Sequence, residues 1–312
     1  MRHKLNAATV LEDPHIRELL NFNNSLAIRD LTFRVLVQLI LMYLVYFLFS
    51  SEKFILGVFS FYILAIWHSF WGYAGLGHEL VHSRVFSNKK VNLLLYYFSS
   101  ALVYSNPVFF RLSHYHHHAH TFAEDDAETK VAQGWGKMEI VFYMTIDVPF
   151  MCRRLFYTFI NSFGYLYSDG VFRKISTLHQ HAAAIILLIQ IVISVSIYAY
   201  TENLLFNILW LLLPFTGQMF NRILSQSQHV GLEVYRNHGP LHHSRSISLP
   251  KLATFLYAGM NYHAEHHLIP SIPYYNLHKL SDYLVRLHGH QVIDWRSFYG
   301  SQFFLLLRTK TS

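Results

Sequence analysis

Residues 114–118 read His-Tyr-His-His-His, and their H-x-x-H-H spacing returns at residues 263–267, which read His-Ala-Glu-His-His. A third cluster, His-Glu-Leu-Val-His, occupies residues 78–82. The chain carries 22 histidines in 312 residues, and neutral imidazole is the commonest protein ligand for transition metals. All three clusters lie beside apolar runs. The sequence therefore predicts a polynuclear metal centre assembled at a membrane face.

The composition indicates an integral membrane protein. Hydrophobic residues make up 53% of the chain and charged residues only 14%, whereas soluble domains carry about 25% charged residues. A helix that crosses a bilayer needs roughly 20 mostly apolar residues, and four runs qualify: 33–50, 54–76, 181–200 and 204–224. The first begins too late for a cleaved signal peptide. We expect an all-α integral membrane fold with four transmembrane helices.

The distribution of charge predicts the orientation. The net charge is +7, but the basic residues do not form one patch, so nucleic acid is not an expected partner. They fall in segments that would share one face of the membrane. The two tight connections between spans, 51–53 and 201–203, contain a single basic residue, Lys53. Basic residues concentrate on the cytoplasmic side of membrane proteins. Both termini and the histidine clusters are therefore expected in the cytoplasm.

The whole chain, 1–312, is expected to form a single membrane domain. A polar N-terminal cap (1–30) precedes a first hairpin (about 33–76), and a second hairpin (about 181–224) leads into a histidine-rich cytoplasmic cap (225–312). The apolar stretch 91–110 lies between two clusters that must meet, so it has to dip and return or lie in the interface. Residues 139–163 are expected to form a second interfacial segment.

The spacing of the histidines indicates how they would share metals. His78 and His82 are four apart and lie on one face of a helix. Adjacent histidines on a helix diverge by about 100°, so a pair can serve two different metals. His116 and His120 fall outside the repeated pattern and are expected at the surface or beside the ligands. The acidic residues Glu124, Asp125, Asp126 and Glu128 could accept the second N–H of ligating histidines, or form a solvated loop.

Two other functions deserve weighing. His78-Glu79-Leu-Val-His82 matches the H-E-x-x-H signature of zinc proteases, in which Glu79 would be the general base and Asp169 a further ligand. That reading leaves two clusters unexplained. A metal transporter would hold its ligands near the bilayer midplane, but only His68 lies well inside a span. We expect His68 to be a packing residue, with lining of a substrate tunnel as the alternative.

The motifs resemble those of the membrane fatty-acid desaturase/hydroxylase superfamily, the histidine-box di-iron enzymes. The resemblance covers roughly residues 50–290 and is carried by residues 77–83, 110–121 and 261–277. It implies two iron ions, O₂ as co-substrate and a four-span helical fold with a cytoplasmic cap. The eight box histidines implied as ligands are His78, His82, His114, His117, His118, His263, His266 and His267.

The segment that follows the last span extends this set. Residues 225–232, Ser-Gln-Ser-Gln-His-Val-Gly-Leu, resemble the His-Tyr-Gly-Leu stretch of alkane hydroxylases, which makes His229 the expected ninth ligand. The residues expected to contact the ligands without binding metal are Glu79, Asp125, Asp126, Glu265, His242 and His243.

The resemblance also implies the reaction class. We expect a desaturase that acts on a lipid or fatty-acyl chain, with a hydroxylase or monooxygenase of an alkyl, lipid or carotenoid-like substrate as the alternative. The single cysteine, Cys152, excludes a cysteine-ligated iron–sulfur cluster within this chain. Electrons are therefore expected from a separate donor, which would be a ferredoxin, a rubredoxin or a cytochrome.

Overall fold

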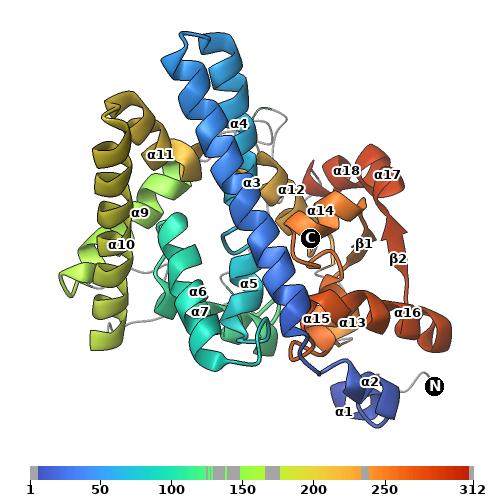
Figure 1. Ribbon diagram of the computed structural model, residues 1–312. Helices are drawn as coiled ribbons and strands as arrows, with labels where there is room; N and C mark the ends of the chain where they lie inside the picture. The colour runs from blue at the N-terminus through green and yellow to red at the C-terminus, as the bar shows by residue number, and fades with distance from the viewer. Residues whose placement is uncertain are drawn as a thin grey trace.

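The computed structural model describes residues 6–123, 126, 128, 138, 148–165, 176–232 and 239–308. These residues are mostly helical, as expected, and form two helical hairpins beside a cap built largely from the C-terminal part of the chain (Figure 1). Three of their helices are long and apolar enough to cross a membrane, or up to four if a bent helix pair is one span. The chain is therefore a membrane protein.

The first hairpin pairs α3 (Asn24–Ser50) with α4 (Phe54–Ser69). The helix α3 begins where the Asn23 side chain accepts a hydrogen bond from the backbone of Leu26, which is earlier than the predicted span. Large apolar side chains such as Phe33, Leu36 and Ile40 are exposed along it, as expected of a surface that faces lipid.

The predicted second span, 54–76, is too long by seven residues. The helix α4 has only 16 residues, or about 24 Å at 1.5 Å per residue, against about 30 Å of hydrocarbon. It ends because the chain turns tightly at Gly75, where a Cβ atom would lie 2.1 Å from the carbonyl oxygen of Phe70. This turn starts a separate short helix, α5 (Leu76–Val81), which carries the first histidine cluster.

The second hairpin consists of α10 (Thr177–Thr201), α11 (Leu204–Thr216) and α12 (Gln218–Ser227). Together α11 and α12 make one candidate span, with Pro214 inside α11 and a break at Gly217. A Cβ atom at Gly217 would lie 1.9 Å from the carbonyl oxygen of Ala65. Only glycine lets the two hairpins approach this closely.

The apolar stretch between the first two clusters is broken, as predicted. The helices α6 (Lys89–Leu102) and α7 (Pro107–Ala119) meet at an angle of 104°. Asn106 caps α7 by accepting from the backbone of Val108 and Phe109, and Pro107 occupies the first turn. The bend returns the chain so that α7 presents the second cluster to α5. In the other segment expected to be interfacial, α9 (Val148–Ser162) packs against α10, whereas residues 139–147 lie outside the described residues.

In its described residues, the cap contains short helices and one small sheet. Its helices are α1 (Ala7–Val10), α2 (Pro14–Glu18), α13 (Pro240–His243), α14 (Lys251–Leu256), α15 (His263–Leu268), η2 (Tyr274–Asn276), α16 (Leu277–His288), α17 (Trp295–Ser297), η3 (Phe298–Gln302) and α18 (Phe303–Arg308). The strands β1 (Ser246–Ser248) and β2 (Val292–Asp294) pair in parallel. The all-α expectation is wrong on this point. Gly289 ends α16 in the left-handed region, and β2 follows it alongside β1.

A buried arginine joins the first hairpin to the cap. The guanidinium of Arg34, in α3, donates to the backbone carbonyls of Phe255 and Leu256 at the end of α14. It also lies 4.2 Å from the centre of the Phe255 ring. A cation at the C-terminus of a helix satisfies carbonyls that have no partner in the helix and interacts favourably with its dipole. This contact holds the cap against the membrane helices.

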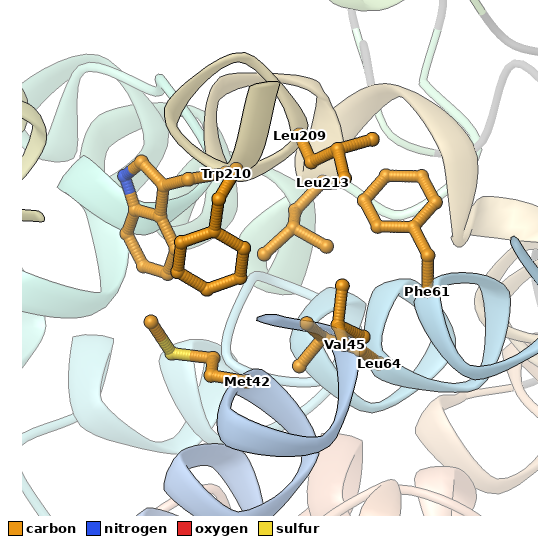
Figure 2. Close-up of a pocket in the computed structure, with 8 residues that line it drawn as sticks. Met42, Val45, Phe61, Leu64, Leu209, Trp210 and Leu213 are labelled. Atoms are coloured by element: carbon orange, nitrogen blue, oxygen red, sulfur yellow. The ribbon is translucent and has the colours of Figure 1, made fainter. Parts of the chain in front are cut away.

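His68 is a packing residue, as predicted. Its Nε2 lies 3.0 Å from the carbonyl oxygen of Leu102, and its Nδ1 lies 3.3 Å from the amide nitrogen of Gln38. The ring also packs edge-on against Trp210. Trp210 borders an apolar gap between α3, α4 and α11 (Figure 2). The gap holds only about 10 Å³, close to the volume that one water needs.

Candidate metal centre

The nine histidines predicted as ligands come together at the junction of the hairpins and the cap. They are supplied by α5 and the residue that ends it, by α7, by the turn after α12, and by α15. They form two sets, and within each set the potential ligand nitrogens all lie within 4.8 Å of one another. The five-histidine set consists of His78, His82, His114, His118 and His266. The four-histidine set consists of His117, His229, His263 and His267.

The Nε2 atoms of each set converge on a common centre. In the five-histidine set, neighbouring Nε2 atoms are separated by 2.9 to 3.2 Å. In the four-histidine set, the separations are 3.0 to 3.2 Å. Metal–nitrogen bonds of about 2.1 Å at right angles separate neighbouring nitrogens by about 3.0 Å. Each set therefore has the dimensions of one metal coordination sphere.

The adjacent histidines divide between the two sets. His117 belongs to the four-histidine set and His118 to the five-histidine set, and His266 and His267 are divided in the opposite order. This is the arrangement that a rotation of about 100° per residue makes possible on α7 and α15. His116 and His120 belong to neither set; their rings stack on each other with centroids 4.7 Å apart.

The Nδ1 atoms of several of these histidines face an acceptor. The Nδ1 atom of His114 lies 2.9 Å from Glu128, and that of His117 lies 3.0 Å from Asp126. An Nδ1–H that donates to a carboxylate leaves the lone pair on Nε2. Lone pairs that converge at about 3 Å repel one another unless a cation lies between them. The tautomers that these contacts select therefore fit bound metal ions.

Backbone carbonyls fix two further rings. The Nδ1 atom of His229 lies 2.9 Å from the carbonyl oxygen of His243, and that of His78 lies 3.2 Å from the carbonyl oxygen of Tyr73. His243 was expected beside the ligands, and its backbone makes the contact. Tyr73 was not predicted, because a carbonyl contact leaves no mark on residue type.

Burial favours the neutral form of most of these imidazoles. Desolvation, with a smaller contribution from nearby positive charge, lowers the pKa of His82 and that of His229 to about 3 each. His117 differs: burial lowers its pKa, but the hydrogen bond that it donates to Asp126 and the charges of Glu128 and Asp126 outweigh burial, so this pKa lies above its usual value. Neutral imidazole is the form that binds metal.

The remaining residues predicted to contact the ligands have different positions. Glu79 is completely buried, with one carboxylate oxygen 3.5 Å from Nδ1 of His266, and burial raises its pKa to about 8. The carboxylate of Glu265 instead contacts Ser246 and His290, which tie the C-terminal segment to α15.

Of the other predicted residues, the His242 side chain is exposed, and Asp125 and Asp169 lie outside the described residues. Glu128, predicted only as a member of the acidic run, has a direct contact with His114.

Comparison with known proteins agrees with this geometry. A family model described as fatty acid desaturase matches residues 53–298, a range that contains both histidine sets and most of the cap. No curated protein matches the chain significantly.

Proposed function

Since this chain belongs to the fatty acid desaturase family, we propose that it is a membrane-bound, di-iron, O₂-dependent desaturase that introduces a double bond into a lipid or fatty-acyl chain. The observation that carries this proposal is the convergence of nine Nε2 atoms into one set of five and one of four. Two adjacent sets made only of imidazole, the four-histidine set buried and the five-histidine set mostly buried, suit a dinuclear redox centre.

The choice of iron rests on the donor set and the chemistry. Breaking an unactivated C–H bond needs a redox metal, and zinc has no redox chemistry. Imidazole suits iron. When bound, the iron pair would supply the reduction of O₂ with two delivered electrons and the abstraction of hydrogen from the substrate. The donor of these electrons would be a separate ferredoxin, rubredoxin or cytochrome.

The protein's own residues hold and orient the metal ligands. Asp126 and Glu128 lie close in sequence and face His117 and His114, one ligand of each set. These two neighbouring carboxylates thereby orient one imidazole ring at each of the two proposed metal sites. Burial of the ligands limits the access of water, which protects a reactive centre from side reactions.

A hydroxylase or monooxygenase acting on an alkyl, lipid or carotenoid-like substrate is the second candidate. Both reactions begin with the same hydrogen abstraction. They differ in whether the substrate radical loses a second hydrogen or captures oxygen, which depends on the position of the substrate carbon.

The protease and transporter alternatives explain less of the structure. His78 and His82 lie in a five-histidine set, and Glu79 lies against the Nδ1 side of His266, so Glu79 does not face the convergent Nε2 atoms as a general base would. A protease also leaves the four-histidine set without a function. A transporter would need ligands near the midplane of spans, whereas His68, the histidine inside α4, makes packing contacts.

The proposal is tested by metal analysis together with product analysis. Protein purified without oxygen should hold two irons per chain, and cells that express it should accumulate an unsaturated lipid absent from a His263→Ala control. His120→Ala is the matched variant that should keep the product, because His120 is exposed outside both sets. A hydroxylated product would favour the second candidate. One tightly bound zinc with peptidase activity lost in Glu79→Gln would contradict the proposal.

A further inference from the structure

The last helix of the described chain exposes apolar side chains. In α18, Phe303 is fully buried, whereas Phe304 is 48% exposed and Leu305 is 62% exposed. The sequence of this helix is Phe-Phe-Leu-Leu-Leu-Arg. The sequence predicts that the cap lies wholly in the cytoplasm, where its surface would face water. Neighbouring exposed phenylalanine and leucine side chains are unusual on such a surface.

The helix α18 packs against the end of the last candidate span. Phe303 and Phe298 form a small core with Val230, against which Ile223 of α12 packs. At Gly231, a Cβ atom would lie 2.6 Å from a methyl group of Leu306. The helix α18 is therefore held directly beside the chain that leaves α12, two residues after the ligand His229.

The contacts of α14 indicate where α18 lies relative to the lipid-facing surface. Its Phe255 ring packs against Phe33, with centroids 5.5 Å apart, and Phe33 is one of the exposed apolar side chains in the first half of α3. One turn earlier on α14, Leu252 is exposed. Leu249, which precedes α14, packs against the same core as Phe303. The helices α14 and α18 thus lie together at the edge of the lipid-facing surface, on the side that the charge distribution predicts to be cytoplasmic.

Exposed cations flank this apolar surface. Lys251 begins α14, and Arg308 ends α18. Basic residues beside an apolar helical face are typical of segments that lie in the membrane interface, where they meet anionic headgroups. Figure 1 shows α18 at the end of the cap nearer the middle of the hairpins and α16 at the opposite end.

We propose that α18, together with Leu252 of α14, inserts its apolar face into the cytoplasmic leaflet of the bilayer, with Lys251 and Arg308 at the headgroups. The bilayer is the occupant because the apolar surface continues the lipid-facing surfaces of α3 and α12, where Phe33 and Phe220 are exposed. The insertion rests on the membrane fold and not on the proposed reaction. It anchors the segment that packs beside His229.

A matched pair of labels tests this insertion. Leu305→Cys in α18 is compared with Leu287→Cys in α16, a leucine of nearly equal exposure at 64%. Both variants carry Cys152→Ser, since Cys152 is the one native thiol and is exposed. Each protein is labelled with a fluorophore in nanodiscs that contain anionic lipid, and quenching by nitroxide-labelled lipid is compared with quenching by aqueous iodide.

The ratio of lipid quenching to iodide quenching should be at least about threefold higher at position 305 than at position 287, because only the first label would lie in the bilayer. Equal ratios would show that α18 lies no deeper in the bilayer than α16 does. Protection of position 305 from both quenchers would show that protein covers it. Either result overturns the proposal. A second pair, Phe304→Cys with 48% exposure against Val285→Cys with 43%, guards against a poorly folded variant.

Discussion

Replacement of two neighbouring histidines should have different effects on metal content. His117 and His118 are consecutive in α7, yet the first belongs to the four-histidine set and the second to the five-histidine set. His117→Ala leaves three imidazoles at its site, whereas His118→Ala leaves four. We expect both variants to lose turnover, because each changes the geometry of one metal, but only His117→Ala should lose a metal.

The size of the effect follows from the contacts of His117. Loss of a partner that merely orients a ligand costs about 10- to 100-fold in metal affinity. His117→Ala removes the ligand itself and also leaves the buried carboxylate of Asp126 without its imidazole partner. The affinity of the four-histidine site should therefore fall by more than about 100-fold, or about 2.7 kcal/mol at 1.36 kcal/mol per factor of ten.

The assay is elemental analysis of protein purified without oxygen and then dialysed against a graded series of chelator concentrations. The unmodified chain should retain two metals per chain, His117→Ala one, and His118→Ala close to two. The controls are His116→Ala and His120→Ala, whose rings stack on each other outside both sets, and these should keep both metal and activity. If His116 proved essential and His117 dispensable, the assignment of the second cluster would be one residue out of register. Equal metal loss in His117→Ala and His118→Ala would refute the division into five and four.

Three further predictions follow from single contacts or from topology. Asp126→Asn should lower metal affinity by about 10- to 100-fold, because it weakens the contact with Nδ1 of His117; unchanged competition against a chelator would count against this role. Gly217→Ala should destabilise the protein by about 1–3 kcal/mol or more, since the new Cβ would meet Ala65, and thermal unfolding in detergent should show this while Gly300→Ala, which faces open space, changes little. Tags at both termini and in the 120–135 segment should be accessible only from the cytoplasm, and access to that segment from the other side would contradict a shared metal centre.

Much of the fold is predictable because the bilayer restricts what an apolar run can do. A long apolar segment must satisfy its backbone hydrogen bonds internally, so it forms a helix, and α3 and α10 appear close to where the composition places them. The boundaries are less predictable. The end of α4 depends on the tight turn at Gly75, and Gly72 and Gly75 are its only sign in the otherwise apolar residues 70–76.

The candidate site is also predictable from the sequence only in part. The repeated H-x-x-H-H spacing identifies six histidines, the pair at 78 and 82 adds two, and the resemblance adds His229. Helical geometry alone predicts that adjacent histidines diverge. What local spacing cannot predict is which histidine of one cluster meets which of another. The pairing of His118 with His266, and of His117 with His267, depends on how α7 and α15 are packed, over a sequence separation of roughly 150 residues.

The sequence by itself determined the class of the protein, its helical membrane character and the residues able to bind metal, because these depend on residue type and on spacing within one helix. Only the tertiary structure decided the division into five and four, the carbonyls of Tyr73 and His243 that orient the rings of His78 and His229, and the placement of α18 beside α12. These features are contacts between distant segments, and two of them use backbone atoms that every residue possesses. Such contacts are selected by packing of the whole chain, so local sequence patterns carry no record of them.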